Sequence, residues 1–324
     1  MASTTILDQV PCETLQAASP TLCPSLNLLS SIRSSESSNV ESLFKPGDVV
    51  ELQGPSASGK SHFLWYIIIR CILPTFHDAI RLDGWAKAAV LFDTDSTFDV
   101  CRFRTILSSH LAKLGVPAVS IGPVIQAAMS NFHIFRPGSS MQLAASLVNL
   151  PTYHATSLSA SEIGLVAVDS MSTFYWPDRF AVEQLRSFGK VSEPSSSVYP
   201  LHNIATVLER FHVSHNPLII LTNWGLNLES SSPFYKQHLY PFTSNFTTED
   251  RPSMAKFSSN PPLASPLSLT AHITFTPARH RQTGPLSTDQ QTENFAEIEC
   301  ICRFVDRNQC RFRIKVTSED VSLI

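Results

Sequence analysis

Asp48 to Ile69 reads DVVELQGPSASGKSHFLWYIII, and this stretch decides the fold. Its first six residues, DVVELQ, carry Val49, Val50 and Leu52 and predict a short strand. The strongly apolar run that begins at Lys60 predicts a helix of about four turns. Between them, GPSASGKS fits G-x-x-x-x-G-K-[S/T] at every fixed position, with the strand before it and the helix after it that the motif requires.

The chemistry of this loop is phosphate binding. Its glycines let the backbone approach a polyphosphate closely, and the N-terminus of the helix favours an anion. We expect Lys60 to reach the β- and γ-phosphates of a nucleotide and the Ser61 hydroxyl to coordinate Mg²⁺. The predicted nucleotide-binding residues are Gly54, Pro55, Ser56, Ala57, Ser58, Gly59, Lys60 and Ser61. The alternative is a chance match in an ordinary strand, turn and helix.

Strands alternate with helices on both sides of the loop. Further strands are expected at 88–93, 131–135, 163–169 and 218–223, with helices at about 60–73, 98–114, 141–150 and 201–211. This alternation predicts an α/β fold with a mostly parallel central sheet flanked by helices. The chain then ends in strands at 269–275, 296–305 and 310–316, which we expect to be antiparallel. In the last of these, Phe312, Ile314 and Val316 alternate with basic residues, so one strand face is predicted to be buried and the other basic.

Polar residues follow three of the predicted buried strands. Asp169 ends IGLVAVD and is the predicted acidic partner of the loop, holding Mg²⁺ together with Ser61. Asp93 and Asp95, in LFDTD, end a second strand, and a carboxylate there could polarise the attacking water; the alternative is a pair that caps the next helix. Asn223 ends LIILTN and could sense the γ-phosphate, or could equally be a turn residue. Carboxyl ends of parallel strands meet at one edge of the sheet, where ligands bind.

Composition limits the function classes. The formal net charge is −3 and charged residues make up 16%, which excludes a globally basic coat for nucleic acid. The longest apolar run, Phe63 to Ile69, is far short of a membrane span, so we expect no membrane association. The seven cysteines have no zinc-finger spacing and are expected to be reduced thiols.

The chain divides into an arm and one core. Residues 1–43 are rich in Ser, Thr and Pro and are expected to form a flexible N-terminal arm. Residues 44–324 are expected to form the nucleotide-binding core. Inside it, residues 227–267 are Ser/Pro/Phe-rich without a clear period and are expected to form a long mobile loop.

In this order, the motifs resemble the RecA-type recombinase paralogue family. The resemblance runs from about Gly47 to Val316 and is carried by the loop, LFDTDSTFD, FHIF, VAVDS and LTN. Closer likeness to one group of paralogues lies in RCILP (70–74), DTDSTFDVCRFRTIL (93–107) and DSMSTFYWPDR (169–179). It implies a RecA-like P-loop NTPase core that binds ATP and Mg²⁺. It also implies a nuclear subunit of a recombinase-paralogue complex, assisting the main recombinase filament in double-strand break repair by homologous recombination.

Two departures from the active recombinases bear on catalysis. Where the family carries a Glu that activates water, this chain has Asp95, one methylene shorter, and such a displacement can cost orders of magnitude in rate. Where the family has a Gln after the sensor Asn, this chain has Trp224. With Asp95 and Asp169 as the candidate catalytic residues, we therefore expect at most a weak, DNA-dependent ATPase.

DNA contact is expected to be weak or made through partners. The two loops that hold DNA in recombinases correspond to about 175–198 and 225–266, where bases and acids are nearly balanced. A better basic patch is Arg311, Arg313 and Lys315, with Arg303 and Arg307 nearby, unless it is simply a solvated strand face. Two alternative functions stay open: a self-sufficient DNA-dependent ATPase that forms filaments, and a small-molecule P-loop kinase.

Overall fold

A ten-stranded sheet forms the centre of the described part of the chain, in the order β12-β11-β10-β8-β1-β7-β6-β4-β5, with β9 pairing β10 at the side. The structure is a computed structural model that describes residues 44–187, 200–228, 233–235, 267–277, 279–282, 294–305 and 309–324. The predicted N-terminal arm and most of the predicted 227–267 loop lie outside these residues.

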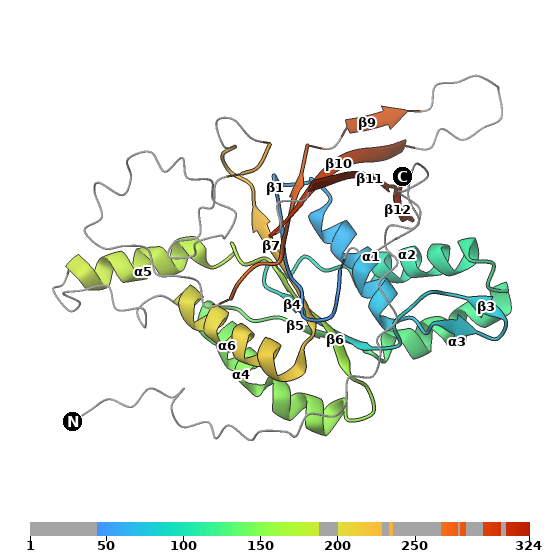
Figure 1. Cartoon of the computed structure of the whole chain (residues 1–324), viewed down its shortest axis with the longest axis horizontal. Coiled ribbons are helices and arrows are strands. Elements are labelled where there is room, and N and C mark those ends of the chain that lie inside the picture. The colour runs from blue at the N-terminus through green and yellow to red at the C-terminus, as the bar shows by residue number, and fades with distance from the viewer. Residues whose placement is uncertain are drawn as a thin grey trace.

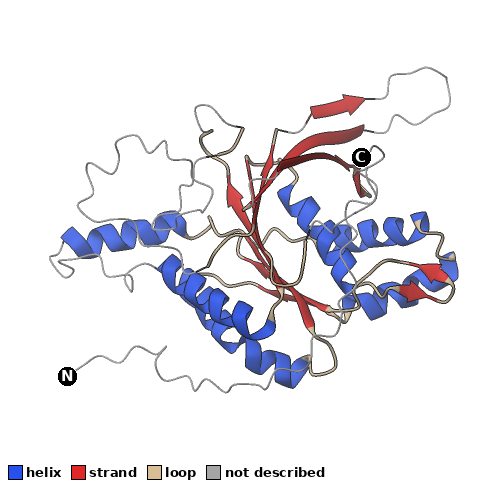
Figure 2. Cartoon of the chain, in the orientation of Figure 1, coloured by secondary structure: helices blue, strands red, loops and turns tan. Residues whose placement is uncertain are grey.

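The sheet has a parallel part and an antiparallel part (Figure 2). The parallel strands are β1 (Val49–Gly54), β4 (Ala88–Asp93), β5 (Phe132–Phe135), β6 (Ile163–Asp169), β7 (Leu218–Trp224) and β8 (Ala271–Phe275). The antiparallel strands are β9 (Arg279–Gln282), β10 (Asn294–Phe304), β11 (Gln309–Val316) and β12 (Val321–Leu323). The predicted fold class is confirmed: a mostly parallel α/β sheet that continues into C-terminal antiparallel strands.

Helices cover both faces of the sheet (Figure 1). One apolar core lies between the sheet and α1 (Lys60–Ile72), α2 (Val100–Lys113) and α3 (Ala118–Met129). The second lies between the opposite face and α4 (Ser140–Ser157) and α6 (Pro200–His215), with α5 (Tyr175–Ser187) beside them. A small hairpin, β2 (Phe76–His77) with β3 (Ile80–Arg81), follows α1.

Strand residues alternate between the two cores, and this alternation decides which polar side chains meet. In β1, Val50 and Leu52 pack toward α1, while Val49 belongs to the opposite core. Polar residues of the central strands follow the same rule, since successive side chains of a strand point to opposite faces.

The structure differs from the predicted elements at two informative places. α3 was not predicted, because Gly122 and Pro123 are poor helix formers, yet its residues Val124, Ile125 and Ala128 are buried against the core. α5 occupies much of the segment expected to be the first DNA loop, so residues 175–187 are helical rather than a loop. None of the described helices is long and apolar enough to cross a membrane.

Candidate functional site

The Gly54–Ser61 loop joins β1, at the middle of the sheet, to α1. Gly59 is the N-cap of α1 in the left-handed conformation (φ +83°), where a side chain is strained. A Cβ there would also lie 2.4 Å from Cδ1 of Ile298 on β10. At Gly54, a Cβ would lie 2.9 Å from Phe275 and 2.7 Å from the Ser58 hydroxyl. Both glycines of the motif are therefore required by close packing in this fold.

Lys60 lies across its own loop. Its Nζ donates hydrogen bonds to the backbone oxygens of Gly54 (2.9 Å) and Pro55 (2.8 Å). Burial lowers the pKa of this ammonium, while the carboxylates of Asp169 and Asp95 act in the opposite direction. The loop thus holds a half-buried cation between two strand-end acids, in the crevice where ligands bind in such sheets.

Asp169, at the end of β6, is brought together with the loop. Its carboxylate accepts hydrogen bonds from the hydroxyls of Thr222 and Ser61. Burial raises the pKa of Asp169, and these two hydrogen bonds and Lys60 offset part of that rise. The pair of Ser61 hydroxyl and Asp169 carboxylate supplies hard oxygen donors of the kind that Mg²⁺ takes, so the residues present fit the predicted cation.

The two acids that follow β4 have different environments. Asp93 is buried, accepts hydrogen bonds from the backbone N–H groups of Thr97 and Phe98, and forms an ion pair with Arg136 at 3.1 Å. It therefore holds the turn before α2, whose N-cap is Asp99 rather than Asp93. Asp95 is exposed, accepts a hydrogen bond from the Thr173 hydroxyl and lies close enough to Lys60 to act on its charge. Of the two, Asp95 faces the crevice.

Asn223 is not assembled with the loop. It follows Thr222 directly on β7, and because Thr222 points toward Asp169, Asn223 points to the opposite face of the sheet. There its amide donates to the buried Glu51 carboxylate and accepts from the Ser172 hydroxyl at 3.4 Å. Strand parity therefore places the Asn223 side chain on the sheet face opposite Thr222, and its role as a γ-phosphate sensor stays a prediction.

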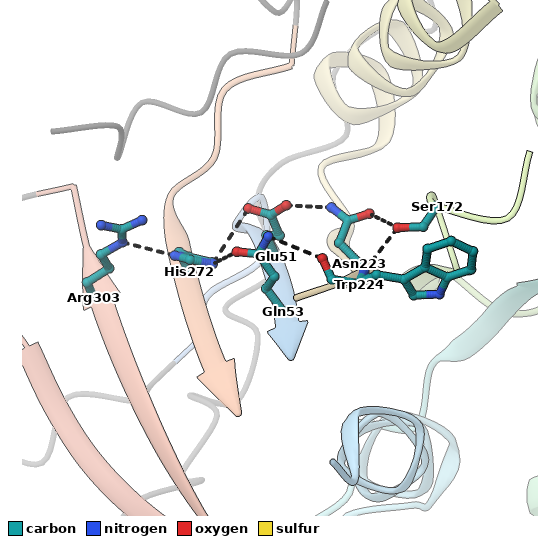
Figure 3. Close-up of polar contacts among 7 residues, drawn as sticks. All are labelled: Glu51, Gln53, Ser172, Asn223, Trp224, His272 and Arg303. Carbon is teal, nitrogen blue, oxygen red and sulfur yellow. Dashed lines mark hydrogen bonds and ion pairs between the residues drawn. The ribbon is translucent and has the colours of Figure 1, made fainter. Parts of the chain in front are cut away.

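A buried polar chain crosses the sheet on this second face, and the sequence did not predict it (Figure 3). Arg303 Nε donates to His272 Nδ1 (2.9 Å), and His272 Nε2 contacts Gln53 Oε1 (2.9 Å). Since Arg303 can only donate, Nδ1 is unprotonated and Nε2 carries the proton. Burial lowers the pKa of His272, with Arg303 adding to the effect, so the ring is neutral.

Glu51 is the carboxylate of this buried polar network, and its contacts explain how a carboxylate can lie inside the sheet. It is 2% exposed, is held by Asn223, and lies 3.8 Å from His272 Nε2. Glu51 and His272 interrupt otherwise apolar strands in the sequence, and that interruption was the available signal for a buried network.

The predicted basic patch is largely neutralised. On β11, Arg313 forms an ion pair with Glu297 (2.8 Å) and Arg311 with Glu299 (3.4 Å), both from neighbouring β10. Arg303 lies on the same face of the sheet but is covered there: it is 8% exposed, with its guanidinium 3.9 Å from the ring centroid of Phe234. Arg307 lies outside the described residues.

The aromatic residues of the two predicted DNA loops fall into two groups. Phe234 and Tyr235 are buried rather than presented for base stacking. On α5, Trp176 is 49% and Phe180 61% exposed, but Arg179 beside them is paired with Glu183 at 2.9 Å. Lys190, Tyr240 and the basic residues of 236–266 lie outside the described part of the chain.

Two partly buried histidines, His62 of α1 and His110 of α2, lie on the helices that pack on the first core. Burial lowers the pKa of His62 to about 4, with Arg102 adding to the effect, and burial likewise lowers the pKa of His110 to about 4. Nε2 of each ring is buried without a hydrogen-bond partner among the described residues. Both rings are therefore neutral at pH 7.

We expect acid to destabilise the protein through these two histidines. The unfolded chain takes up their protons near pH 6.5, whereas the folded chain does so only near pH 4, so stability falls as the pH drops through this window. At pH 5 the loss is about 2 kcal/mol for each ring. In urea unfolding at pH 7 and pH 5, His110→Leu should show a drop smaller by about that amount than the wild type. An equal fall in the free energy of unfolding for the variant and the wild type would show that His110 does not cause the acid sensitivity.

Fold and site together define a class of protein: an α/β protein with a RecA-like core and a GxxxxGKS loop between its first strand and first helix. Among known proteins, the chain is similar to the DNA repair protein XRCC2 of Mus musculus, with 34% identity over 186 residues, 57% of this chain and 59% of that protein. It is also similar to the DNA repair protein XRCC2 homolog of Arabidopsis thaliana, with 26% identity over 216 residues, 58% of this chain and 57% of that protein. The chain thus matches under two thirds of each relative's length.

No protein-family model matches the chain. The two curated relatives nevertheless confirm the resemblance to recombinase paralogues that the motifs predicted.

Proposed function

We propose that this chain is an ATP-binding recombinase paralogue that acts in DNA double-strand break repair by homologous recombination. The observation that carries the proposal is the sequence similarity to two proteins named for DNA repair. The chain would work in the nucleus as a subunit of a complex of recombinase paralogues that assists the main recombinase filament. Removing the protein from its source cells should make the cells sensitive to agents that break both DNA strands. The protein should also co-purify with another recombinase paralogue. Normal resistance of the cells to such agents would contradict the proposal.

The loop geometry supports nucleotide binding. Lys60 and the N–H groups of the loop would hold the phosphates, and Ser61 and Asp169 would hold Mg²⁺. Bound Mg²⁺ would neutralise phosphate charge. In this arrangement the Lys60 ammonium is already partly removed from water and lies near the carboxylates of Asp169 and Asp95. It therefore places a positive charge in the crevice. Asp95 is the residue that would orient a water, and its short side chain favours slow turnover.

DNA engagement would depend on partners. The arginines of β11 are paired with glutamates of β10, so this strand face offers little net positive charge. Because phosphate contacts supply most non-specific affinity for DNA, a neutralised face predicts weak binding by the chain alone.

Replacing Lys60 by alanine is expected to weaken ATP binding by roughly 10–100-fold, since hydrogen bonds to charged groups contribute about 1.5–3 kcal/mol. A titration with a fluorescent ATP analogue and Mg²⁺ measures the affinity. Lys45→Ala is the matched control, because Lys45 is exposed and lies before β1; its affinity should equal that of the wild type. Equal affinities for both variants would contradict the nucleotide site.

A further inference from the structure

Two cysteines face each other across the antiparallel pair of β10 and β11. Cys302 of β10 and Cys310 of β11 are register partners in an antiparallel pair. Residues opposed in this way have Cα separations of about 4.5–5.5 Å, inside the range of about 4.4–6.8 Å that a disulfide needs. Both are thiols in this structure. The backbone therefore already has the spacing of a cross-strand disulfide.

The side chains meet on the inner face of the hairpin. A hydrogen bond with Cys310 raises the pKa of the Cys302 thiol, and burial adds to the effect. Cys302 belongs to the core that packs on α1, and Cys310 is partly buried against that core. Cys300, two residues earlier on the same face of β10, has Phe312 as its register partner and so no thiol opposite it.

We propose that Cys302 and Cys310 form a reversible disulfide when the protein meets hydrogen peroxide. Cys310 is the more exposed of the two sulfurs and reacts first. Its thiolate attacks one peroxide oxygen, the O–O bond breaks, and the other oxygen leaves as water. Cys302 sulfur then attacks the sulfenic acid, the S–O bond breaks, and a second water forms. In sum, two thiols and one hydrogen peroxide give one disulfide and two waters.

The two cysteines lie on strands that also contact the Gly54–Ser61 loop. Ile298 and Ile314 are register partners further along the same two strands, and both Cδ1 atoms lie close to Gly59 of the loop. The strands that the disulfide would join therefore pack on the loop at Gly59. Oxidation would fix the pairing of the strands that pack on the candidate nucleotide site, and a reductant would release it.

Peptide mapping of the purified full chain tests the proposal. Arg303 and Arg307 lie between the two cysteines, so trypsin separates them unless a disulfide holds the peptides together. After treatment with hydrogen peroxide, the unlinked Cys310 peptide should fall by at least about tenfold, because an opposed thiol has a high effective concentration. Dithiothreitol should restore it.

Matched variants identify the sulfur on β10. Cys302→Ala should abolish the linked peptide, while Cys300→Ala, a change of the same kind on the same strand face, should keep it. The proposal is overturned if the wild-type Cys310 peptide stays unlinked while the exposed Cys101 is oxidised, or if Cys302→Ala still gives a link, through Cys300. The wild-type map decides the question even if a variant does not fold.

Discussion

Replacing Arg303 by leucine is expected to lower the free energy of unfolding by about 3–5 kcal/mol, the cost of breaking a buried charge network by removing one partner. Arg303 donates to His272, and His272 Nε2 lies 3.8 Å from the Glu51 carboxylate on the same face of the sheet. Without the guanidinium, His272 Nδ1 loses its donor, and the buried anion loses the nearby cation of its network. The Phe234 ring also loses the cation that stacks on it at 3.9 Å.

Arg311→Leu is the matched control. Arg311 stands on neighbouring β11 and pairs with Glu299, but its side chain is 71% exposed. Exposed ion pairs contribute about 0–1 kcal/mol, so this variant should unfold at nearly the wild-type denaturant concentration. Urea unfolding at pH 7 measures both. Equal and small losses would show that Arg303 is an ordinary surface arginine and that the buried network contributes little.

The different environments of Arg303 and Arg311 could not be predicted from the sequence. Arg303 and Arg311 read alike in the sequence, as bases on late strands, and only the structure separates them. Phe234, about seventy positions earlier in the chain, covers Arg303 and turns an expected surface charge into an interior one. A contact between such distant segments leaves no local pattern, so neither periodicity nor composition could have predicted it.

The strands and helices that follow local rules were predictable. The runs that became β4 and β6 were predicted with the bounds that the structure has, because strands buried on both faces are continuously apolar. Helix α4 was predicted too short, since it continues through Pro151 to Ser157. Packing against the core outweighed the local cost of proline there, as it did in α3.

The candidate site was predictable where it is local or follows from strand ends. The loop was identified from its spacing, and the meeting of Lys60 with Asp169 follows from the convergence of parallel strands. The contacts of Asn223 were not predicted, because one residue along a strand reverses the face to which a side chain points. Its neighbour Thr222 took the position next to Asp169, and Asn223 joined the network around Glu51.

Replacing Asp169 by asparagine should change function and stability in opposite directions. Burial raises the pKa of this carboxyl, so its ionised form costs free energy in the folded protein at neutral pH. A neutral amide of the same shape removes that cost and can still accept from the Thr222 hydroxyl. We therefore expect the variant to be at least as stable as the wild type at pH 7. As the pH falls toward the raised pKa, protonation of Asp169 should stabilise the wild type, whereas the variant has no such group to protonate.

Mg²⁺-dependent ATP affinity should fall in the same variant by at least the roughly 10–100-fold that losing a group around a bound metal costs. Titrations of a fluorescent ATP analogue with Mg²⁺ and with EDTA separate the metal-dependent part, and urea unfolding gives the stability. Asp93→Asn is the matched control: Asp93 is also an acid at the end of a strand, but it holds a turn and pairs with Arg136, so this variant should lose stability and keep the Mg²⁺ effect. If Asp169→Asn kept its Mg²⁺ dependence, the cation would have to be held elsewhere, and the pairing of Ser61 with Asp169 would be structural only.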